Sequence, residues 1–303
     1  MNLRDEHHRS YLELLPPPDL HLDLDARLER LRQQLADGTC SPADVFVTLD
    51  DEDRVEATCR LADLTETSRV LTQLRWRGAP EAPSKGVVLI EEALARAREL
   101  GLARISTRPT DAFLDDGYRA ALIAGGFVLE GGRVEFKTPV DELPHEDAES
   151  LLTWRDLGEL GWDRVTAVMA RTSQDPAATV EQATRELRDF LAPDDIHNQP
   201  DCVELGFLDD EPVAFLCAQS DATGWGTISF MGLVPEARGR GLGGAVQRRG
   251  FSLLRRQGAA LYHDGTESEN HPMLALFARH GCREHARMTE WEWTSANARG
   301  TES

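Results

Sequence analysis

The feature that most constrains the fold of this chain is an order of predicted elements that occurs twice. Each half predicts a β-hairpin, a strand, a helix, a short strand, a second helix and closing strand residues. These elements fall within residues 44–137 in the first half and within residues 202–293 in the second. The middle segments, 101–127 and 258–282, match closely in length. Two tandem copies of one α/β unit account for this repetition.

Apolar spacing and turn residues define the individual elements. Residues 87–100 carry apolar side chains at helical spacing, and Gly101 then stands where a helix C-cap belongs. Residues 242–257 show the same arrangement in the second half. In the first half, Gly131-Gly132 predicts the turn of a hairpin over residues 128–137. Strands and helices therefore alternate in both copies, which is an α/β pattern.

A boundary between the copies is predicted near residues 139–149, where Pro, Asp, Glu and His cluster without periodicity. We therefore predict one domain over residues 1–140 and a second over 146–297. The total of 303 residues is enough for two ordinary domains. Before the first copy, residues 24–35 predict a charged amphipathic helix and residues 11–15 a strand.

Composition excludes several classes of function. A net charge of −20 and an isoelectric point near 4.8 argue against nucleic-acid binding. No apolar run approaches the roughly 18 residues that a membrane span requires, so no membrane partner is expected. The five cysteines show no CxxC spacing, which predicts no disulfide framework, no metal site and a reducing cytoplasm. The charged N-terminus has no apolar segment typical of a secretory signal.

A glycine-rich loop at residues 238–244 carries the chemistry that the sequence reveals. It follows a predicted strand over residues 227–234 and leads into a predicted helix. Glycines let backbone amides turn toward a ligand, and the helix start adds unpaired N–H donors with a partial positive charge. Arg238 and Arg240 are able to add charge-assisted hydrogen bonds. The loop therefore predicts a site for a phosphate or pyrophosphate.

The same glycines formally satisfy a second motif. Gly239, Gly241 and Gly244 fit GxGxxG, and Asp264 lies about 20 residues on, as in dinucleotide-binding sites. In that motif, however, the first glycine follows the strand directly, whereas four residues intervene here. The remaining chain is also too short for the doubly wound sheet that should begin at this point.

The loop resembles the signature of the GCN5-related N-acetyltransferase (GNAT) family, Arg/Gln-x-x-Gly-x-Gly/Ala, at Arg238, Gly241 and Gly243. Residues 233–238 resemble the family's usual lead-in, apolar-x-Pro-Glu-x-Arg. The later Asn270, Phe277 and Gly281 resemble its asparagine, aromatic residue and helix end. The resemblance implies two tandem GNAT-like domains, each a mixed, mostly antiparallel twisted sheet flanked by helices.

The resemblance also implies where a cofactor binds. Acyl-CoA would lie between two splayed strands like a missing strand, with the Leu233 amide at the acyl carbonyl. Asn270 would face the pantetheine arm, although a helix N-cap is an equally open interpretation. The implied cofactor-binding residues are Leu233, Val234, Arg238, Gly239, Arg240, Gly241, Leu242, Gly243, Gly244, Asn270 and Phe277.

The first copy resembles the same family without a usable loop. Alignment on its helix places residues 81–86 at the phosphate position, where only Gly86 remains of the glycines. Glu81 would put a carboxylate in place of the arginine, and Pro83 removes an amide donor. We therefore expect this copy to bind no CoA and to have a structural role.

The usual catalytic residues of the family are missing. Members of the family often carry a carboxylate base where this chain has Thr227 and Ser229. They often carry a tyrosine that acts as general acid where this chain has Phe277. Candidate replacements are Glu267, Tyr262 and His263, which lie on or just after a predicted strand. Orientation of the substrates with little proton transfer is an alternative.

The resulting interpretation is an acyl-CoA-dependent N-acetyltransferase. We expect it to transfer acetyl, or another short acyl group, from acyl-CoA to a primary amine of a small molecule. Residues 162–195 would select the acceptor, with Asp194 and Asp195 able to attract an ammonium group. The protein would be a monomer or a homodimer. The alternatives are a non-catalytic acyl-CoA sensor and an NAD-dependent oxidoreductase.

Overall fold

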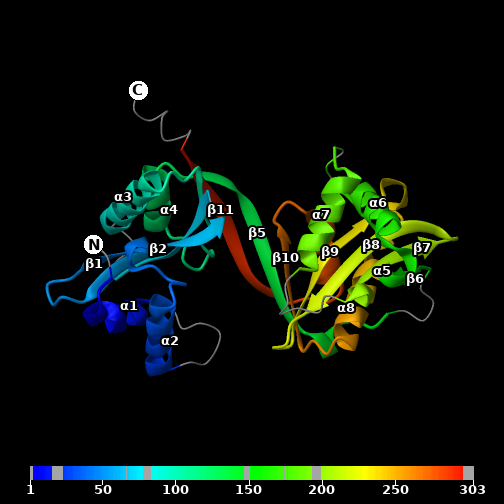
Figure 1. Ribbon diagram of the computed structural model, residues 1–303, viewed down its shortest axis with the longest axis horizontal. Coiled ribbons are helices and arrows are strands. Elements are labelled where there is room, and N and C mark those ends of the chain that lie inside the picture. Colours follow the sequence, from blue (N-terminus) through cyan, green and yellow to red (C-terminus); the bar gives the residue numbers. More distant parts are fainter. Residues whose placement is uncertain are drawn as a thin grey trace. The chain divides into compact units, whose positions relative to one another are not determined.

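The computed structural model describes residues 3–15, 23–65, 67–77, 83–146, 151–173, 175, 177–192 and 199–295. The chain divides into two compact units (Figure 1). The first combines residues 1–133 with residues 287–303, and the second is formed by residues 134–286.

The first unit has a mixed sheet with helices on both faces. Its strands are β1 (Val45–Leu49), β2 (Val55–Thr65), β3 (Ser68–Trp76), β4 (Arg104–Thr107) and the end of β11 (Glu284–Thr294). Neighbouring strands are antiparallel except for the parallel pair β3 and β4. Helices α3 (Pro83–Glu99) and α4 (Asp116–Ala124) cover one face, and α1 (His8–Leu14) and α2 (Leu24–Ala36) cover the other (Figure 1).

The second unit repeats this plan. Its strands follow the order β5-β10-β9-β8-β7-β6, and the parallel pair is β9 and β10. The strands are β5 (Val128–Pro139), β6 (Thr153–Asp156), β7 (Val203–Leu208), β8 (Glu211–Ser220), β9 (Trp225–Leu233) and β10 (Leu261–Glu267). Helices α6 (Trp162–Thr172) and α7 (Val180–Phe190) cover one face, and α8 (Gly243–Arg256) and α9 (His271–Arg279) cover the other. The short α5 (Leu157–Leu160) follows β6.

Central strand β8 lies in the core of this unit and is buried on both faces. All residues from Val213 to Ser220 are buried, because helices cover both faces of the sheet. Its neighbour β7 is buried from Val203 to Phe207 in the same way. The predicted fold class, a tandem α/β arrangement of mixed, mostly antiparallel strands flanked by helices, is confirmed.

Two strands cross from one unit to the other. In β5, Val134 and Phe136 are buried in the core of the second unit. In β11, Trp291 and Trp293 are buried in the core of the first unit, where residues 291–294 pair with β4. The units therefore differ from the predicted domains 1–140 and 146–297, since β11 completes the core of the first unit.

The hairpin predicted for residues 128–137 is wrong. Gly131 and Gly132 lie within one continuous strand, β5, and neither has a positive φ. The strand predicted for residues 11–15 is also wrong, because α1 covers His8–Leu14. Buried His8, Tyr11 and Leu12 recur at helical spacing, a signal that the short predicted segment did not include. No described helix is long and apolar enough to cross a membrane.

Candidate functional site

A cavity of about 580 Å³ lies in the second unit where strands β9 and β10 part. The two strands are paired at Leu261 with Trp225 and at Tyr262 with Gly226, which lie at their beginnings. Further along, Met231, Gly232 and Leu233 of β9 line the cavity instead of pairing with β10. The strand edge beyond the paired residues is therefore available to a ligand.

The glycine-rich loop forms one end of this cavity. Gly239 has a φ of 72° and Gly241 a φ of 78°, both in the left-handed region that favours glycine. A Cβ atom at either position would meet no atom within 4 Å. Glycine is thus required by the backbone conformation, and the space beside the loop is open to a bound group.

The first turn of α8 completes an anion receptor. Leu242, at the N-cap, makes no side-chain capping hydrogen bond, and the first turn contains no acidic residue. The initial N–H groups of a helix have no partners within the helix and carry a partial positive charge. Gly243 and Gly244 line the cavity at this point, and Arg279 approaches from α9. These features fit a phosphate or pyrophosphate group.

Arg238 lines the cavity, but its side chain donates hydrogen bonds to backbone carbonyls of the protein. Its Nε donates to the carbonyl of Leu233 at 3.0 Å. Its Nη2 donates to the carbonyls of Thr172 at 3.0 Å and Ser173 at 3.3 Å. Arg238 therefore ties the loop to the ends of β9 and α6. These contacts indicate a structural role for the Arg238 side chain. They do not indicate the direct anion binding that was predicted for it.

A β-bulge sets the direction of the β9 backbone. Ile228 and Ser229 together oppose one residue of β8, because Thr227 pairs with Gln219 and Phe230 with Cys217. After the bulge, the Val234 N–H donates to the carbonyl of Val213 at 3.0 Å. Antiparallel ladders alternate the direction of successive amides. The amide of Leu233 therefore faces away from β8, toward the cavity.

Asn270 caps helix α9, as one of the two interpretations predicted, and also borders the cavity. Its side-chain oxygen accepts from the Met273 N–H at 3.2 Å, so it caps helix α9. Its Nδ2 donates to Thr266 Oγ1 at 3.0 Å. The residue also lines the cavity. A single side chain thus fixes the start of α9 and borders the ligand space.

Three residues predicted to bind the cofactor lie outside the cavity lining. Phe277 is fully buried and stacks on Phe136, with ring centroids 4.1 Å apart. Val234 is also buried in the core. Arg240 is exposed beside the loop. The aromatic ring of Phe277 therefore supports the helix layer beneath the cavity.

Two of the three candidate catalytic residues are poorly placed. Tyr262 is fully buried against Phe251, and its hydroxyl donates to Asp264 Oδ2 at 2.9 Å. Burial raises the pKa of Tyr262 well above its usual range, with a further contribution from Asp264. Glu267 is exposed at the end of β10 and does not line the cavity.

His263 lies on the opposite side of β10 from Tyr262, because successive side chains alternate. Its ring meets Trp225 edge to face at 5.2 Å. Its Nε2 is 3.6 Å from Glu135 Oε2, on strand β5. Burial lowers the pKa of His263 and outweighs the opposing effect of Glu135. The imidazole is thus held neutral, the form that accepts a proton.

Comparison with known proteins identifies the family of this unit. Residues 166–282 match the model of the acetyltransferase (GNAT) family. This chain carries a GNAT domain. No curated protein matches the sequence.

Solved structures extend the GNAT likeness to the fold of both units. A GCN5-related N-acetyltransferase from Sphaerobacter thermophilus matches with a TM-score of 0.65 and 15% identity, over 97% of this chain and 94% of that one. A tandem GNAT protein from the clavulanic acid biosynthesis pathway matches with a TM-score of 0.55 and 16% identity, over 96% of this chain and 95% of that one. A glucosamine N-acetyltransferase region of a fungal β-N-acetylglucosaminidase matches with a TM-score of 0.52 and 15% identity, over 90% of this chain and 37% of that one.

The first GNAT-like copy has side chains where the second has its cavity. Trp76, at the end of β3, packs against Tyr118 of α4 with ring centroids 5.7 Å apart. A Cβ atom on Gly86 would lie 2.9 Å from the Trp76 ring. The space lined by these two rings is about 170 Å³. Aromatic side chains therefore occupy this part of the first copy; the predicted loop residue Glu81 lies outside the described residues.

Sequence reasoning missed two polar residues near the GNAT site. Glu135 was hidden because residues 128–137 were interpreted as a hairpin. Gln219 is buried: its Nε2 donates to the Phe190 carbonyl at 2.6 Å, and its Oε1 accepts from Ser229 Oγ at 2.6 Å. An isolated glutamine in an otherwise apolar strand was the available signal. Asp194 and Asp195, predicted to attract the acceptor, lie outside the described residues.

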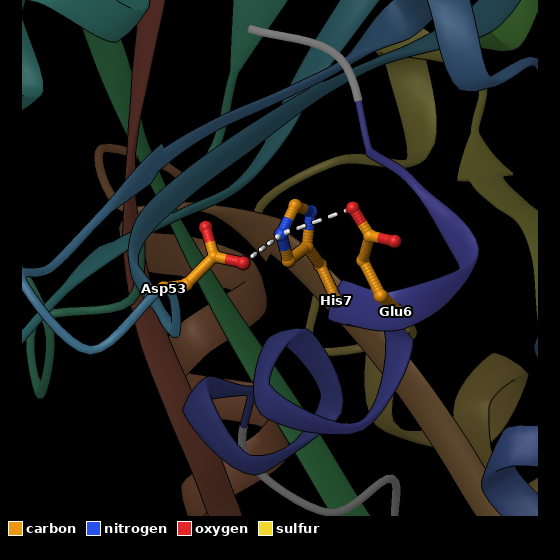
Figure 2. Close-up of side chains that lie close together, drawn as sticks. All are labelled: Glu6, His7 and Asp53. Carbon is orange, nitrogen blue, oxygen red and sulfur yellow. Dashed lines mark ion pairs between the residues drawn. The ribbon is translucent and has the colours of Figure 1, made fainter.

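Among the described residues, Glu6, His7 and Asp53 form a group close enough to share a metal ion (Figure 2). Buried His7 points its Nε2 toward Asp53 Oδ2 at 3.5 Å and toward Glu6 Oε1 at 3.9 Å. Both carboxylates are mostly exposed, and Arg4 pairs with Glu6 at 3.6 Å. The group belongs to the first unit, whereas the cavity of the GNAT domain is lined by the second.

Proposed function

We propose that this protein transfers an acetyl group, or another short acyl group, from acyl-CoA to a primary amine of a small molecule. The family match supports acyltransferase activity in general. The observation that carries the finer proposal is the cavity beside the end of β9, which is lined by the glycine-rich loop, by Leu233 and by residues of α9. An anion receptor and a directed backbone donor are the two features that acyl transfer from CoA needs.

The residues of the loop would hold the diphosphate of CoA. The amides of residues 239–244 and the start of α8 supply hydrogen-bond donors, and Arg279 adds a positive charge. The unpaired edge of β9 would bind the amide groups of the pantetheine arm. At the thioester, the Leu233 amide would donate to the carbonyl oxygen as negative charge develops there.

His263 would act as the general base. The attacking amine must be neutral, so its ammonium form has to lose a proton. Neutral His263 lies near the start of the β9–β10 pair and not at Leu233, so the proton would pass to it through water molecules, and Glu135 would orient the ring. As the nitrogen bonds to the acyl carbon, the carbon–sulfur bond breaks; the nitrogen loses its second proton, which passes through solvent to the departing sulfur, and the products are the amide and the CoA thiol. Phe277 stands where relatives carry an acidic tyrosine, and it has no proton to give this sulfur.

The acceptor would be a small amine and not a nucleic acid. The net charge of −20 attracts cations and repels polyanions. On the side of the sheet opposite Tyr262, His263 and Trp225 are only partly buried, which leaves polar and aromatic groups accessible to an amine. A reducing cytoplasm remains the compartment that we propose.

The substitution Gly243→Glu tests the proposal. The new Cβ would lie 3.2 Å from Leu276 Cδ1, in the cavity wall, and the carboxylate would repel a diphosphate. We expect acetyl-CoA binding, measured by calorimetry, and amine-dependent CoA release to be lost. Ala278→Glu adds the same charge at an exposed position of α9 and should bind normally. Unchanged affinity in a folded Gly243→Glu variant would refute the loop assignment.

The same assays separate the alternatives. Tight acetyl-CoA binding without turnover across a panel of primary amines would favour the sensor, which the buried Phe277 motivates. Binding of NADH in place of acetyl-CoA would favour the oxidoreductase.

A further inference from the structure

Four arginine side chains line a second cavity, which lies in the first unit. Arg27 and Arg30 reach it from α2, Arg60 from β2 and Arg75 from β3. Its volume is about 380 Å³, within the range of about 300–1,000 Å³ that is usual for small-molecule sites. We call it the arginine cavity. Such a concentration of positive charge is unexpected in a chain with a net charge of −20.

The charges in the arginine cavity are not neutralised by the part of the chain that the structure describes. Within that part, none of the four guanidinium groups forms an ion pair with a carboxylate. Three of them donate instead to backbone carbonyls: Arg27 to Leu12 at 2.8 Å, Arg60 to Thr39 at 3.2 Å and Arg75 to Leu74 at 2.7 Å. Carbonyl oxygens carry only partial charge, so these contacts do not neutralise the guanidinium groups.

Arg75 borders both the arginine cavity and the space of about 170 Å³ beside Trp76 and Tyr118, and its guanidinium group contacts residues of the latter. Its Nε is buried without a hydrogen-bond partner, and its guanidinium group lies 3.9 Å over the ring of Phe113. Burial lowers the pKa of Arg75, with Tyr118 opposing the change. A desolvated cation of this kind is stabilised when an anion binds beside it.

The remaining wall of the arginine cavity is largely apolar. Leu12, Leu15 and Leu31 contribute side chains from α1, its C-terminal end and α2. Tyr11 donates a hydrogen bond to Gln73 Oε1 on the same wall. Gln73 has a φ of 57°, a left-handed conformation that is uncommon for a residue other than glycine and often marks binding sites.

We propose that the arginine cavity binds a small organic anion. Its carboxylate or phosphate group would lie among the guanidinium groups, and its apolar body would contact the leucine side chains. Arginine suits both head groups, because its planar fork donates two parallel hydrogen bonds. This site is separate from the glycine-rich loop, which belongs to the other unit, and does not depend on the proposed acyl transfer.

Calorimetry with the full-length chain tests the proposal. The probes are hexyl phosphate, hexanoate, inorganic phosphate and 1-hexanol. We expect one or both organic anions to bind and 1-hexanol not to bind, and the stronger anion identifies the head group. Arg60→Gln should weaken this binding about tenfold or more, because a charge-assisted hydrogen bond is lost. The control Arg98→Gln removes an exposed arginine outside the cavity and should bind like the unsubstituted protein.

The Gly243→Glu background distinguishes this site from the phosphate loop. Binding that persists in that background and falls with Arg60→Gln supports the arginine cavity. Binding that disappears with Gly243→Glu but survives both Arg60→Gln and Arg27→Gln overturns it, as does equal binding of 1-hexanol. No anion binding at millimolar concentration also overturns it. Circular dichroism of each variant shows that the fold is retained.

Discussion

At the scale of single residues, His263 lies between opposing charges. Glu135 raises its pKa, whereas Lys137 and His285 lower it, and burial is the largest influence. Lys137 also lies over the ring of Trp225, with Nζ 5.1 Å from the centroid. Because a general base works only when deprotonated, we expect activity above the pKa of His263 and its loss as the pH falls through that pKa.

Opposite shifts of the pH–rate profile are therefore expected from two substitutions. Glu135→Gln removes the influence that raises the pKa of His263, so activity should persist to lower pH. Lys137→Gln removes an influence that lowers the pKa of His263. As the pH is lowered, this variant should therefore lose activity at a higher pH than the unsubstituted protein does. The measurement is kcat/KM for an accepted amine across the acidic range. Identical profiles in both variants would show that His263 is not the titrating base.

Replacement of His263 itself should reduce activity more than replacement of Glu135 or Lys137. We expect His263→Gln to lower kcat/KM by about 100-fold or more and to remove the acidic limb of the profile. Acetyl-CoA affinity should stay unchanged, since His263 does not line the cofactor cavity. A variant with full activity would leave substrate orientation as the main contribution.

Asn270 combines two functions that substitution separates. Asn270→Ala loses the N-cap of α9 and should lower the free energy of unfolding by about 1 kcal/mol. Asn270→Asp keeps the capping oxygen but loses the Nδ2 donor, so its stability should be retained while acetyl-CoA affinity falls. Urea unfolding and calorimetry measure the two effects. Normal affinity in Asn270→Asp would leave the cap as its whole role.

At the scale of elements, an ion network anchors helix α8, which begins at the glycine-rich loop. Arg249 of α8 donates to Glu204 of β7 at 2.6 and 2.8 Å, and to Glu146 at 2.9 Å. Arg256 adds a contact to Glu204 at 3.2 Å. The Glu204 side chain is only 5% exposed, so its charge depends on these partners.

Loss of that charge should destabilise the second unit. We expect Glu204→Gln to lower the free energy of unfolding by about 3 kcal/mol, because it leaves Arg249 partly buried with one partner fewer. Glu211→Gln, at an exposed position of β8, is the matched control. Equal urea midpoints for the two variants would contradict this role.

The elements themselves were largely predictable from the sequence, but their side-chain directions were not. Helix α8 follows from apolar spacing and from the glycines on either side of it. The bulge at Ile228 and Ser229 has no local signal, since it depends on pairing with β8. Likewise, the arginine cavity joins residues of α2, β2 and β3 that are far apart in the sequence. The conformation of the glycine-rich loop was predictable because the loop is one continuous segment.

At the scale of the whole molecule, each unit needs a strand that sequence order would assign to the other. Trp291 and Trp293 of β11 are 4% and 1% exposed in the core of the first unit. A boundary near residues 139–149 was the natural prediction, because composition changes there. Composition does not reveal which core a strand enters, and so it cannot reveal this exchange.

A fragment of residues 1–140 should therefore fail to fold on its own. It lacks Trp291, Trp293 and one of the two strands that pair with β4, and truncating even one such tryptophan to alanine costs about 3–5 kcal/mol. Addition of a peptide covering residues 284–295 should restore cooperative unfolding, monitored by circular dichroism. A peptide with both tryptophans replaced by alanine is the control. A fragment that folds alone would show that β11 is dispensable.

The contribution of β11 to the first unit also affects the order in which the two units fold during synthesis. Domains generally fold in the order in which the ribosome releases them. Here the core of the first unit is closed only when residues 291–294 of β11 have been made, and all of residues 134–286 of the second unit precede them. Until β11 has been made, one edge of β4 has no partner strand. Nascent chains of this protein should therefore bind chaperones through the first unit.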